Sequence, residues 1–235
     1  MECGVIPNGV NVFPWLVKVV TVGMSGLPLH GGCGGSFISK QHVITARHCI
    51  EKVDFTFYVI YNGHRYEAEV VAKAPNYHKN DRYCGHTDMA ILRLTTAPDD
   101  LVVPICLPKL NDSLAKSGDI LTMASFRGGY HNKSMSVKTS YSICVWPEWD
   151  RKRKSNEILG AINLSSGYMV KPGDSGSPLM RKNNEDVWTL IAIVEGQVYD
   201  VNDTCLGSNF QTIFPKLSWV LGTVKKIPTV KLLNQ

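Results

Sequence analysis

The segment Pro172-Gly173-Asp174-Ser175-Gly176-Ser177-Pro178-Leu179 places a serine between glycines, directly before a run that is typical of a β-strand. A nucleophilic serine needs a tight turn in which neighbouring N–H groups point at the oxygen that becomes negative during acyl transfer. Gly173 permits such a turn. The segment therefore predicts a nucleophile loop, with an ordinary surface loop as the alternative because short Gly/Ser/Asp strings are common.

Two earlier segments carry a histidine and an aspartate in comparable settings. Cys33-Gly34-Gly35-Ser36-Phe37-Ile38 and Val43-Ile44-Thr45-Ala46-Arg47-His48-Cys49 read as an apolar hairpin flanked by cysteines. A disulfide across it would fix the backbone at His48 and favour a positional role, although a lone histidine is more often structural or merely exposed. In Thr87-Asp88-Met89-Ala90-Ile91-Leu92-Arg93-Leu94, Asp88 precedes a strand that reads as core, with a plain turn residue as the alternative.

Short apolar and β-branched runs recur along the chain and are separated by turn-forming residues. They cover residues 15–22, 42–45, 55–61, 68–72, 89–94, 119–124, 137–145, 178–180, 187–194 and 209–213. Many short strands at this spacing predict an all-β architecture of paired barrels or sandwiches. After Pro215, apolar residues at helical spacing predict one carboxy-terminal helix; they are Leu217, Val220, Leu221 and Val224.

The composition is that of an ordinary globular protein, with 235 residues, 44% hydrophobic and 19% charged. The formal charge of +5 is mildly basic, and no nucleic-acid-binding motif accompanies it, so nucleic acid is not an expected partner. The chain lacks the stretch of about 18 apolar residues that a membrane helix needs, so no membrane partner is expected either.

Two features favour a secreted, extracellular glycoprotein. Seven cysteines suit an oxidising compartment if most are paired, and the odd count leaves at least one without an intrachain partner. Glycosylation sequons begin at Asn111, Asn132, Asn163 and Asn202. The first residues, MECGVIPNG, lack the basic and apolar regions of a signal peptide, which leaves earlier removal of a longer amino-terminal region as an open alternative.

Taken in the order His48, Asp88, Ser175, the three segments resemble the chymotrypsin and trypsin family of serine peptidases, and the likeness extends over about residues 6–220. Supporting matches are Phe13-Pro14-Trp15-Leu16-Val17, Pro104-Ile105-Cys106-Leu107-Pro108 and Trp219. The resemblance implies one chymotrypsin-like peptidase domain over residues 1–235, built from two packed six-stranded antiparallel Greek-key β-barrels and a carboxy-terminal helix. The barrels would divide near residues 110 and 111, in the polar connection after Pro108.

The resemblance also implies the role of each residue. His48 would be the general base, Asp88 would orient its imidazole, and Ser175 would be the nucleophile. The amides of Gly173 and Ser175 would form the oxyanion hole. This order of residues does not fit the α/β-hydrolase fold of lipases, in which serine comes first and sits in a Gly-x-Ser-x-Gly elbow.

The segment that activates most relatives is atypical in this chain. Cleavage after a basic residue usually frees an apolar terminus, whose ammonium pairs with the aspartate that precedes the nucleophile. That aspartate corresponds to Asp174, but Val5 stands at the basic position and Pro7 at the second apolar position. A buried carboxylate without a partner is costly, so Asp174 is expected either to find another donor or to turn outward and distort the oxyanion loop.

The specificity pocket differs from that of trypsin-like relatives. Met169 falls where those relatives carry the aspartate that binds Arg or Lys, so a tryptic preference is not expected. Gln197 and Ser208 should narrow the slot and favour a small or medium apolar residue. Glu195 replaces a serine that supports the triad aspartate. Its charge would repel that of Asp88 and raise the pKa of one of the two carboxyl groups, or its side chain would turn to solvent.

The resemblance suggests the disulfides Cys33 with Cys49 and Cys3 with Cys106. It leaves one cysteine free or joined to another chain, from the set Cys84, Cys144 and Cys205. The run Arg151-Lys152-Arg153-Lys154 is typical of a solvated loop, with an anionic polysaccharide site or a processing site as alternatives. The loop from Asn62 to Tyr66 is too short for the calcium loop of many relatives, so neither metal nor cofactor is expected.

Two functions follow from these patterns. The first is a secreted serine endopeptidase that acts on a protein or peptide substrate within a regulated proteolytic cascade, with a regulatory protein or inhibitor as a further partner. The second is a latent or catalytically weak binding module that keeps the peptidase fold. The covalent reactivity of Ser175 distinguishes them.

Overall fold

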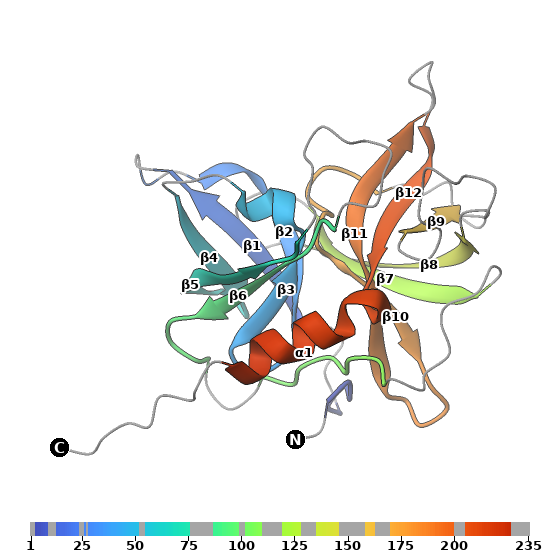
Figure 1. Ribbon diagram of the computed structural model, residues 1–235, viewed down its shortest axis with the longest axis horizontal. Helices are drawn as coiled ribbons and strands as arrows, with labels where there is room; N and C mark the ends of the chain where they lie inside the picture. Colours follow the sequence, from blue (N-terminus) through green and yellow to red (C-terminus); the bar gives the residue numbers. More distant parts are fainter. Residues whose placement is uncertain are drawn as a thin grey trace.

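The computed structural model describes residues 3–8, 13–23, 26, 28–51, 55–75, 87–98, 102–109, 119–127, 135–145, 158–162, 170–199 and 205–226. Twelve strands in these ranges form two closed barrels that lie side by side (Figure 1). Every strand pair is antiparallel. The expected all-β fold with two six-stranded barrels is confirmed.

The first barrel has the strand order β1-β2-β3-β6-β5-β4 and closes through pairing of β4 with β1. Its strands are β1 (Leu16–Val22), β2 (Pro28–Phe37), β3 (His42–Thr45), β4 (Thr56–Tyr61), β5 (His64–Lys73) and β6 (Ala90–Leu94). In β4, Phe57, Val59 and Tyr61 are buried and the residues between them are not, as expected for a strand with one face in the core.

The second barrel has the order β10-β11-β12-β9-β8-β7 and closes through pairing of β7 with β10. Its strands are β7 (Ile120–Arg127), β8 (Met135–Val145), β9 (Ile158–Ile162), β10 (Pro178–Lys182), β11 (Trp188–Tyr199) and β12 (Cys205–Thr212). Two register shifts interrupt the pairing of β11 with β12, one of them at residues 194–196 beside the candidate site.

The expected carboxy-terminal helix is α1 (Leu217–Lys226), which follows the 3-10 turn η2 (Phe214–Lys216). Leu217 and Val220 are buried in the same core cluster as residues of both barrels, and α1 runs beneath them in Figure 1. Of the helices in the described ranges, none has the length and apolar character needed to cross a membrane.

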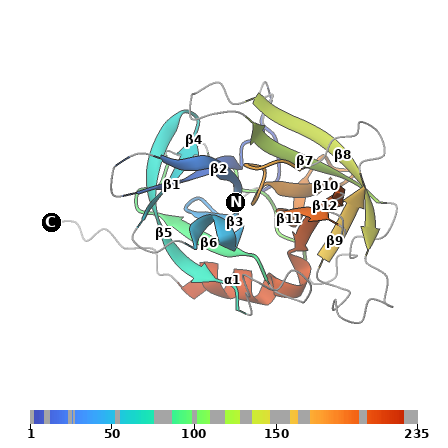
Figure 2. The ribbon, with the colours of Figure 1, turned by 90° about the horizontal axis from the view of Figure 1, so that it is seen from above.

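Aromatic residues before β1 join the two barrels. Trp15 is fully buried, and its indole N–H donates to the Met180 sulfur on β10 at 3.1 Å. Phe13 packs edge-to-face on Trp188 of β11, with ring centroids 5.0 Å apart. Because these contacts fix one barrel against the other, they also fix the position of groups that meet between the barrels. Figure 2 shows the two barrels side by side from above.

The amino-terminal segment is anchored to the second barrel. A disulfide joins Cys3 to Cys106. The Gly4 N–H donates to the Pro104 carbonyl at 2.8 Å, and the Gly4 carbonyl accepts from the Trp188 N–H at 2.8 Å. Gly4 has a φ of 68°, which a residue with a side chain rarely adopts. Cys3 and Gly4 are therefore held beside β11.

Candidate active site

His48 and Asp88 lie together because they flank the paired ends of β3 and β6. Thr45 at the end of β3 pairs with Ala90 at the start of β6, His48 lies three residues beyond Thr45 on η1 (Arg47–Ile50), and Asp88 lies two residues before Ala90. The His48 ring nitrogen Nδ1 is 2.5 Å from Asp88 Oδ2, and the His48 backbone N–H donates to Asp88 Oδ1 at 2.8 Å. Both carboxylate oxygens are thus engaged by one histidine.

The environment raises the pKa of the His48 imidazole above its ordinary value of 6.5. Burial of the ring lowers the pKa, because it penalises the charged form. The hydrogen bond and the charge of Asp88 raise it, as do the charges of Glu195 and Glu51, and these effects prevail. Asp88 itself is 1% exposed, which keeps its charge close to the ring and away from solvent.

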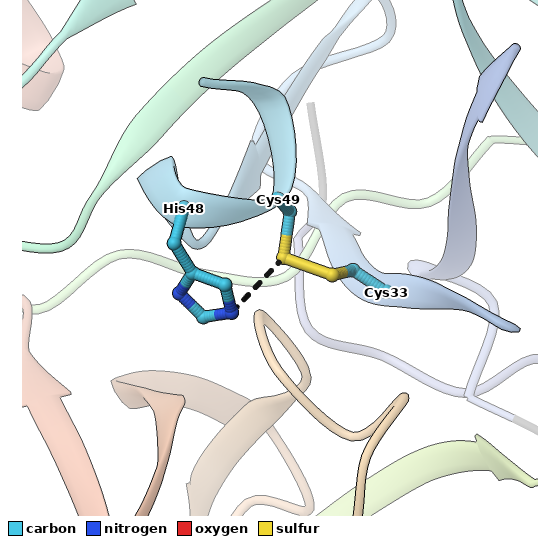
Figure 3. A group of neighbouring side chains, drawn as sticks. All are labelled: Cys33, His48 and Cys49. Carbon is cyan, nitrogen blue, oxygen red and sulfur yellow. Dashed lines mark hydrogen bonds between the residues drawn. A yellow bond between two sulfur atoms is a disulfide. The ribbon is translucent and has the colours of Figure 1, made fainter. Parts of the chain in front are cut away.

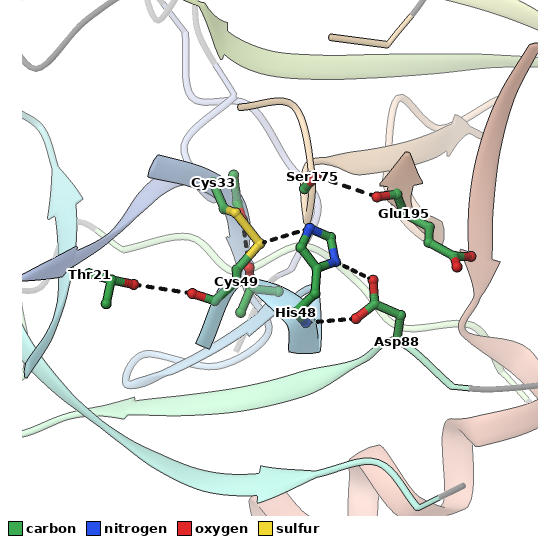
Figure 4. Close-up of a disulfide and its surroundings, with 9 residues drawn as sticks. Thr21, Cys33, His48, Cys49, Asp88, Ser175 and Glu195 are labelled. Atoms are coloured by element: carbon green, nitrogen blue, oxygen red, sulfur yellow. Dashed lines mark hydrogen bonds and ion pairs between the residues drawn. A yellow bond between two sulfur atoms is a disulfide. The ribbon is translucent and has the colours of Figure 1, made fainter. Parts of the chain in front are cut away.

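Ser175 lies in a loop that leads into β10 and touches both barrels. The Gly34 N–H on β2 donates to the Ser175 carbonyl at 2.7 Å, and the Gly176 N–H donates to the Val194 carbonyl on β11 at 2.7 Å. Gly176 has a φ of 80°. In Figure 4, His48 and Asp88 come from the first barrel, whereas Ser175 and Glu195 come from the second, so the three predicted residues meet between the barrels.

Two backbone N–H groups of this loop are available to a ligand. Gly173 and Ser175 donate no hydrogen bond within the described part of the chain. The other N–H groups of the loop are bonded, and they belong to Lys171, Asp174, Gly176 and Ser177. These two donors are the pair predicted to form the oxyanion hole.

The Ser175 hydroxyl donates to the Glu195 carbonyl at 3.4 Å, and among the described residues no hydrogen bond joins it to His48. His48 Nε2 instead lies 3.6 Å from the Cys49 sulfur (Figures 3 and 4). A disulfide sulfur carries no hydrogen, so this contact is a hydrogen bond only when Nε2 carries a proton. When the neutral ring keeps its proton on Nδ1, facing Asp88, the Nε2 lone pair is unused, and catalytic hydrogen bonds often tighten only when substrate binds.

Three side chains with metal-binding atoms meet here, namely Cys33, His48 and Cys49, with ligand atoms within 4.8 Å of one another. The two sulfurs form the Cys33–Cys49 disulfide. Metal binding by cysteine requires the thiolate, so the oxidised pair does not offer that ligand set. The disulfide instead anchors the backbone of the residue that follows His48.

Asp174 points inward and has found other donors. Its carboxylate is 1% exposed, accepts from the Ser125 hydroxyl at 2.6 Å and accepts from the Lys171 N–H at 2.9 Å. The first of the two expected outcomes for Asp174 is therefore the one observed. The role of Ser125 was not predicted from the sequence, in which its only signal is a serine inside the apolar run that forms β7.

One of the two expected placements of Glu195 was a side chain turned to solvent, and this is not observed. Its carboxylate oxygen Oε2 accepts from the Asn209 and Gln211 side-chain amides, each at 2.7 Å. The negative charge of Glu195 also raises the pKa of the His48 imidazole. Asn209 and Gln211 were not identified from the sequence.

Gln197 and Ser208, which are predicted to line the specificity pocket, lie on neighbouring strands. Gln197 on β11 pairs with Ser208 on β12. The Ser208 hydroxyl is buried and accepts from the Val170 N–H at 3.1 Å. This bond ties β12 to the segment before the nucleophile loop, so Ser208 occupies a fixed position.

Several predicted features lie outside the described residues. They are Met169, the sequons at Asn111, Asn132, Asn163 and Asn202, the run 151–154, Cys84, the side chains of Cys144 and Cys205, and the division between residues 110 and 111.

Two antiparallel barrels, with a histidine, a buried aspartate and a serine loop between them, are the architecture of the chymotrypsin-like serine peptidases. The trypsin family model matches residues 6–219, and the chain belongs to this family. Serine protease SSP1 of Scolopendra subspinipes is 31% identical over 239 residues, covering 92% of this chain and 80% of that protein. The solved structure of GrC has a TM-score of 0.66 at 19% identity, covers 90% of this chain and 94% of that chain, and shows the fold alone.

Two further relatives are longer proteins than this chain. CLIP domain-containing serine protease B10 of Anopheles gambiae is 27% identical over 210 residues, covering 74% of this chain and 57% of that protein. Phenoloxidase-activating enzyme 1 of Spodoptera litura is 23% identical over 233 residues, covering 82% of this chain and 62% of that protein. The chain thus spans less than two thirds of the length of either relative.

Proposed function

We propose that the chain is the peptidase domain of a secreted serine endopeptidase that cleaves peptide bonds through an acyl-enzyme. Ser175 is the nucleophile, His48 the general base and Asp88 the residue that orients the imidazole. The observation that carries the proposal is the 2.5 Å contact between His48 and the buried Asp88, opposite a serine loop that has two available N–H donors.

In this mechanism, the substrate displaces the Ser175 hydroxyl from the Glu195 carbonyl. The hydroxyl oxygen attacks the scissile carbonyl and passes its proton to His48 Nε2, while the Gly173 and Ser175 amides bind the developing oxyanion. The tetrahedral intermediate collapses when Nε2 returns the proton to the leaving amine, and a water then releases the acyl group by the same steps. Each oxyanion donor contributes about 3 kcal/mol to the barrier reduction.

The proposed pocket takes a small or medium apolar residue. Ser208 is held by its hydrogen bond to Val170, and Gln197 stands opposite it on β11. Met169, at the position of the tryptic aspartate, would leave Arg or Lys without a counter-charge.

The proposed context is a regulated extracellular cascade. Support comes from the phenoloxidase-activating enzyme among the relatives and from the disulfides Cys33–Cys49 and Cys3–Cys106. We further propose glycosylation at the four sequons, a protein substrate, and a regulatory protein or inhibitor as a partner. An anionic polysaccharide is the proposed ligand of the basic run 151–154.

A latent binding module is the second candidate function. The hydrogen bond from the Ser175 hydroxyl to Glu195, in place of one to His48, favours it. Such a module would fold normally but would not form an acyl-enzyme.

Covalent labelling separates the two functions. The purified glycosylated chain is expected to take up one fluorophosphonate per molecule, and Ser175→Ala is expected to abolish the uptake because its oxygen is the only proposed point of attachment. Intact mass measures the adduct. Ser218→Ala, an exposed position on α1, serves as the control and should label normally. A folded wild type without an adduct would assign the chain to the latent class.

Glu195→Gln is expected to move the acid limb of the labelling rate to lower pH. The general base must be neutral, so the acid limb reports the pKa of His48, which lies above 6.5. Glutamine can still accept from Asn209 and Gln211 but lacks the negative charge that raises this pKa. Labelling rates measured from pH 5 to 9 test the shift, and the exposed Glu185→Gln should leave the profile in place. An unmoved profile in Glu195→Gln would contradict the assigned electrostatic role.

A further inference from the structure

We propose that Ser125 is a positioning residue that holds Asp174, and with it the nucleophile loop formed by residues 171–177, in the uncleaved chain. The inference rests on the proposed function, since it assigns a residue that prepares the same site. With Val5 and Pro7 in the activation segment, the usual activating cleavage is not expected to supply an ammonium to Asp174. The Ser125 hydroxyl on β7 donates to this carboxylate, which in most relatives pairs with the freed ammonium.

The first step is the burial of the pair. Asp174 is 1% exposed and Ser125 is fully buried, and the hydroxyl donates to Asp174 Oδ1 at 2.6 Å. A carboxylate is stable in such a place only if donors replace the water it has lost. A hydrogen bond to a charged group is also stronger than one between neutral groups. The Ser125 hydroxyl therefore favours the inward position of Asp174.

The second step connects Asp174 to the loop. Its Oδ2 accepts from the Lys171 N–H at 2.9 Å, and its own N–H donates to the Lys171 carbonyl at 2.9 Å. These two bonds close a turn that contains Gly173, which has a φ of 97°. Because Asp174 stands between the two available N–H groups of Gly173 and Ser175, an outward movement of its side chain would turn both donors.

The third step explains why β7 can reach the loop. Leu179 on β10 pairs with Met123 on β7. Continuing this antiparallel register by two residues places Ser125, on the same face as Met123, beside Ser177 at the end of the loop. The position of Ser125 thus follows from the closure of the second barrel, independently of the amino-terminal segment, which is bonded beside Trp188.

The test compares variants that differ in one buried hydroxyl. Ser125→Ala removes the donor, and Ser125→Val and Ser125→Thr form an isosteric pair in which threonine alone keeps it. Ser36→Ala is the matched control, because Ser36 on β2 is also fully buried and its hydroxyl has no partner in the described part of the chain. Intact mass establishes that each protein is uncleaved, and thermal unfolding establishes that it is folded.

Two readouts are required. Hydrogen exchange of the peptide covering residues 170–178 reports the loop without any need for activity, and the fluorophosphonate labelling rate reports the prepared site. In Ser125→Ala and Ser125→Val we expect exchange to quicken and labelling to slow, each by about 10- to 100-fold, the range of a hydrogen bond to a charged group. Ser125→Thr and Ser36→Ala should stay within about twofold of the wild type.

The outcomes separate this inference from the proposed function. Unchanged exchange in both Ser125→Ala and Ser125→Val would overturn the inference, even if the wild type labels fully. Faster labelling in these variants would also overturn it, since Ser125 would then restrain the loop in an inactive form. If the wild type does not label but its exchange responds to the loss of the hydroxyl, the inference stands and the proposed function fails.

Discussion

Asp88→Asn is expected to slow fluorophosphonate labelling of Ser175 by about 10⁴-fold, the loss seen when an asparagine replaces the triad aspartate in this class of enzyme. Asp88 accepts two hydrogen bonds from His48, one from the ring and one from the backbone N–H. Asparagine has a single oxygen, and the backbone N–H cannot give up its hydrogen, so this oxygen stays with the backbone.

The asparagine NH₂ group then faces His48 Nδ1. Two donors cannot face each other, so Nδ1 becomes the acceptor and the ring proton moves to Nε2. In that tautomer Nε2 cannot take the proton of the Ser175 hydroxyl. The mutation thus removes the general base while preserving the shape of the site.

Asp186→Asn is the control for this experiment. Its side chain is 80% exposed in the turn between β10 and β11, and asparagine tolerates its positive φ of 62°. It should label at the wild-type rate. A loss of less than about tenfold in Asp88→Asn, with the fold intact, would show that Asp88 does not set the tautomer of His48.

Gly176→Ala is expected to destabilise the fold by about 2–5 kcal/mol, the sum of about 1–2 for a left-handed backbone and about 1–3 for overpacking. Gly176 has a φ of 80°. A Cβ atom there would lie 2.3 Å from the Gly34 carbonyl oxygen and 2.9 Å from the Ala46 nitrogen. Both are backbone atoms of the first barrel, so relief requires the barrels to separate at the site.

Two other glycines isolate the contributions, and chemical denaturation measures all three variants. Gly63→Ala has the positive φ of 79° but open space around its Cβ, so only the backbone cost of about 1–2 kcal/mol should remain. Gly222→Ala in α1 has neither problem and should stabilise the helix by about 0.5–1 kcal/mol. Equal losses in Gly176→Ala and Gly63→Ala would show that the two barrels do not meet tightly at Gly176.

Most strands could be predicted from local patterns, because a strand that packs into a barrel core needs a short run of apolar and β-branched residues wherever it lies, and β3 and β6 are buried almost throughout. The predicted runs 42–45 and 89–94 match β3 and β6 to within one residue. The short strand β9 was not predicted. Its residues, Ile158–Ile162, form a strand by pairing with β8 and β12, which are distant partners that a local pattern does not reveal.

By itself, the sequence determined the family and the order of the three predicted catalytic residues along the chain. His48, Asp88 and Ser175 each stand in a short motif that can be recognised from its neighbouring residues alone. Only the tertiary structure decided how the buried charges are satisfied. Ser125 lies 49 residues before Asp174, and Asn209 and Gln211 reach Glu195 across a strand pair with a register shift. A hydrogen bond between distant segments depends on barrel closure and strand register, and the identities of the residues near either partner do not specify these.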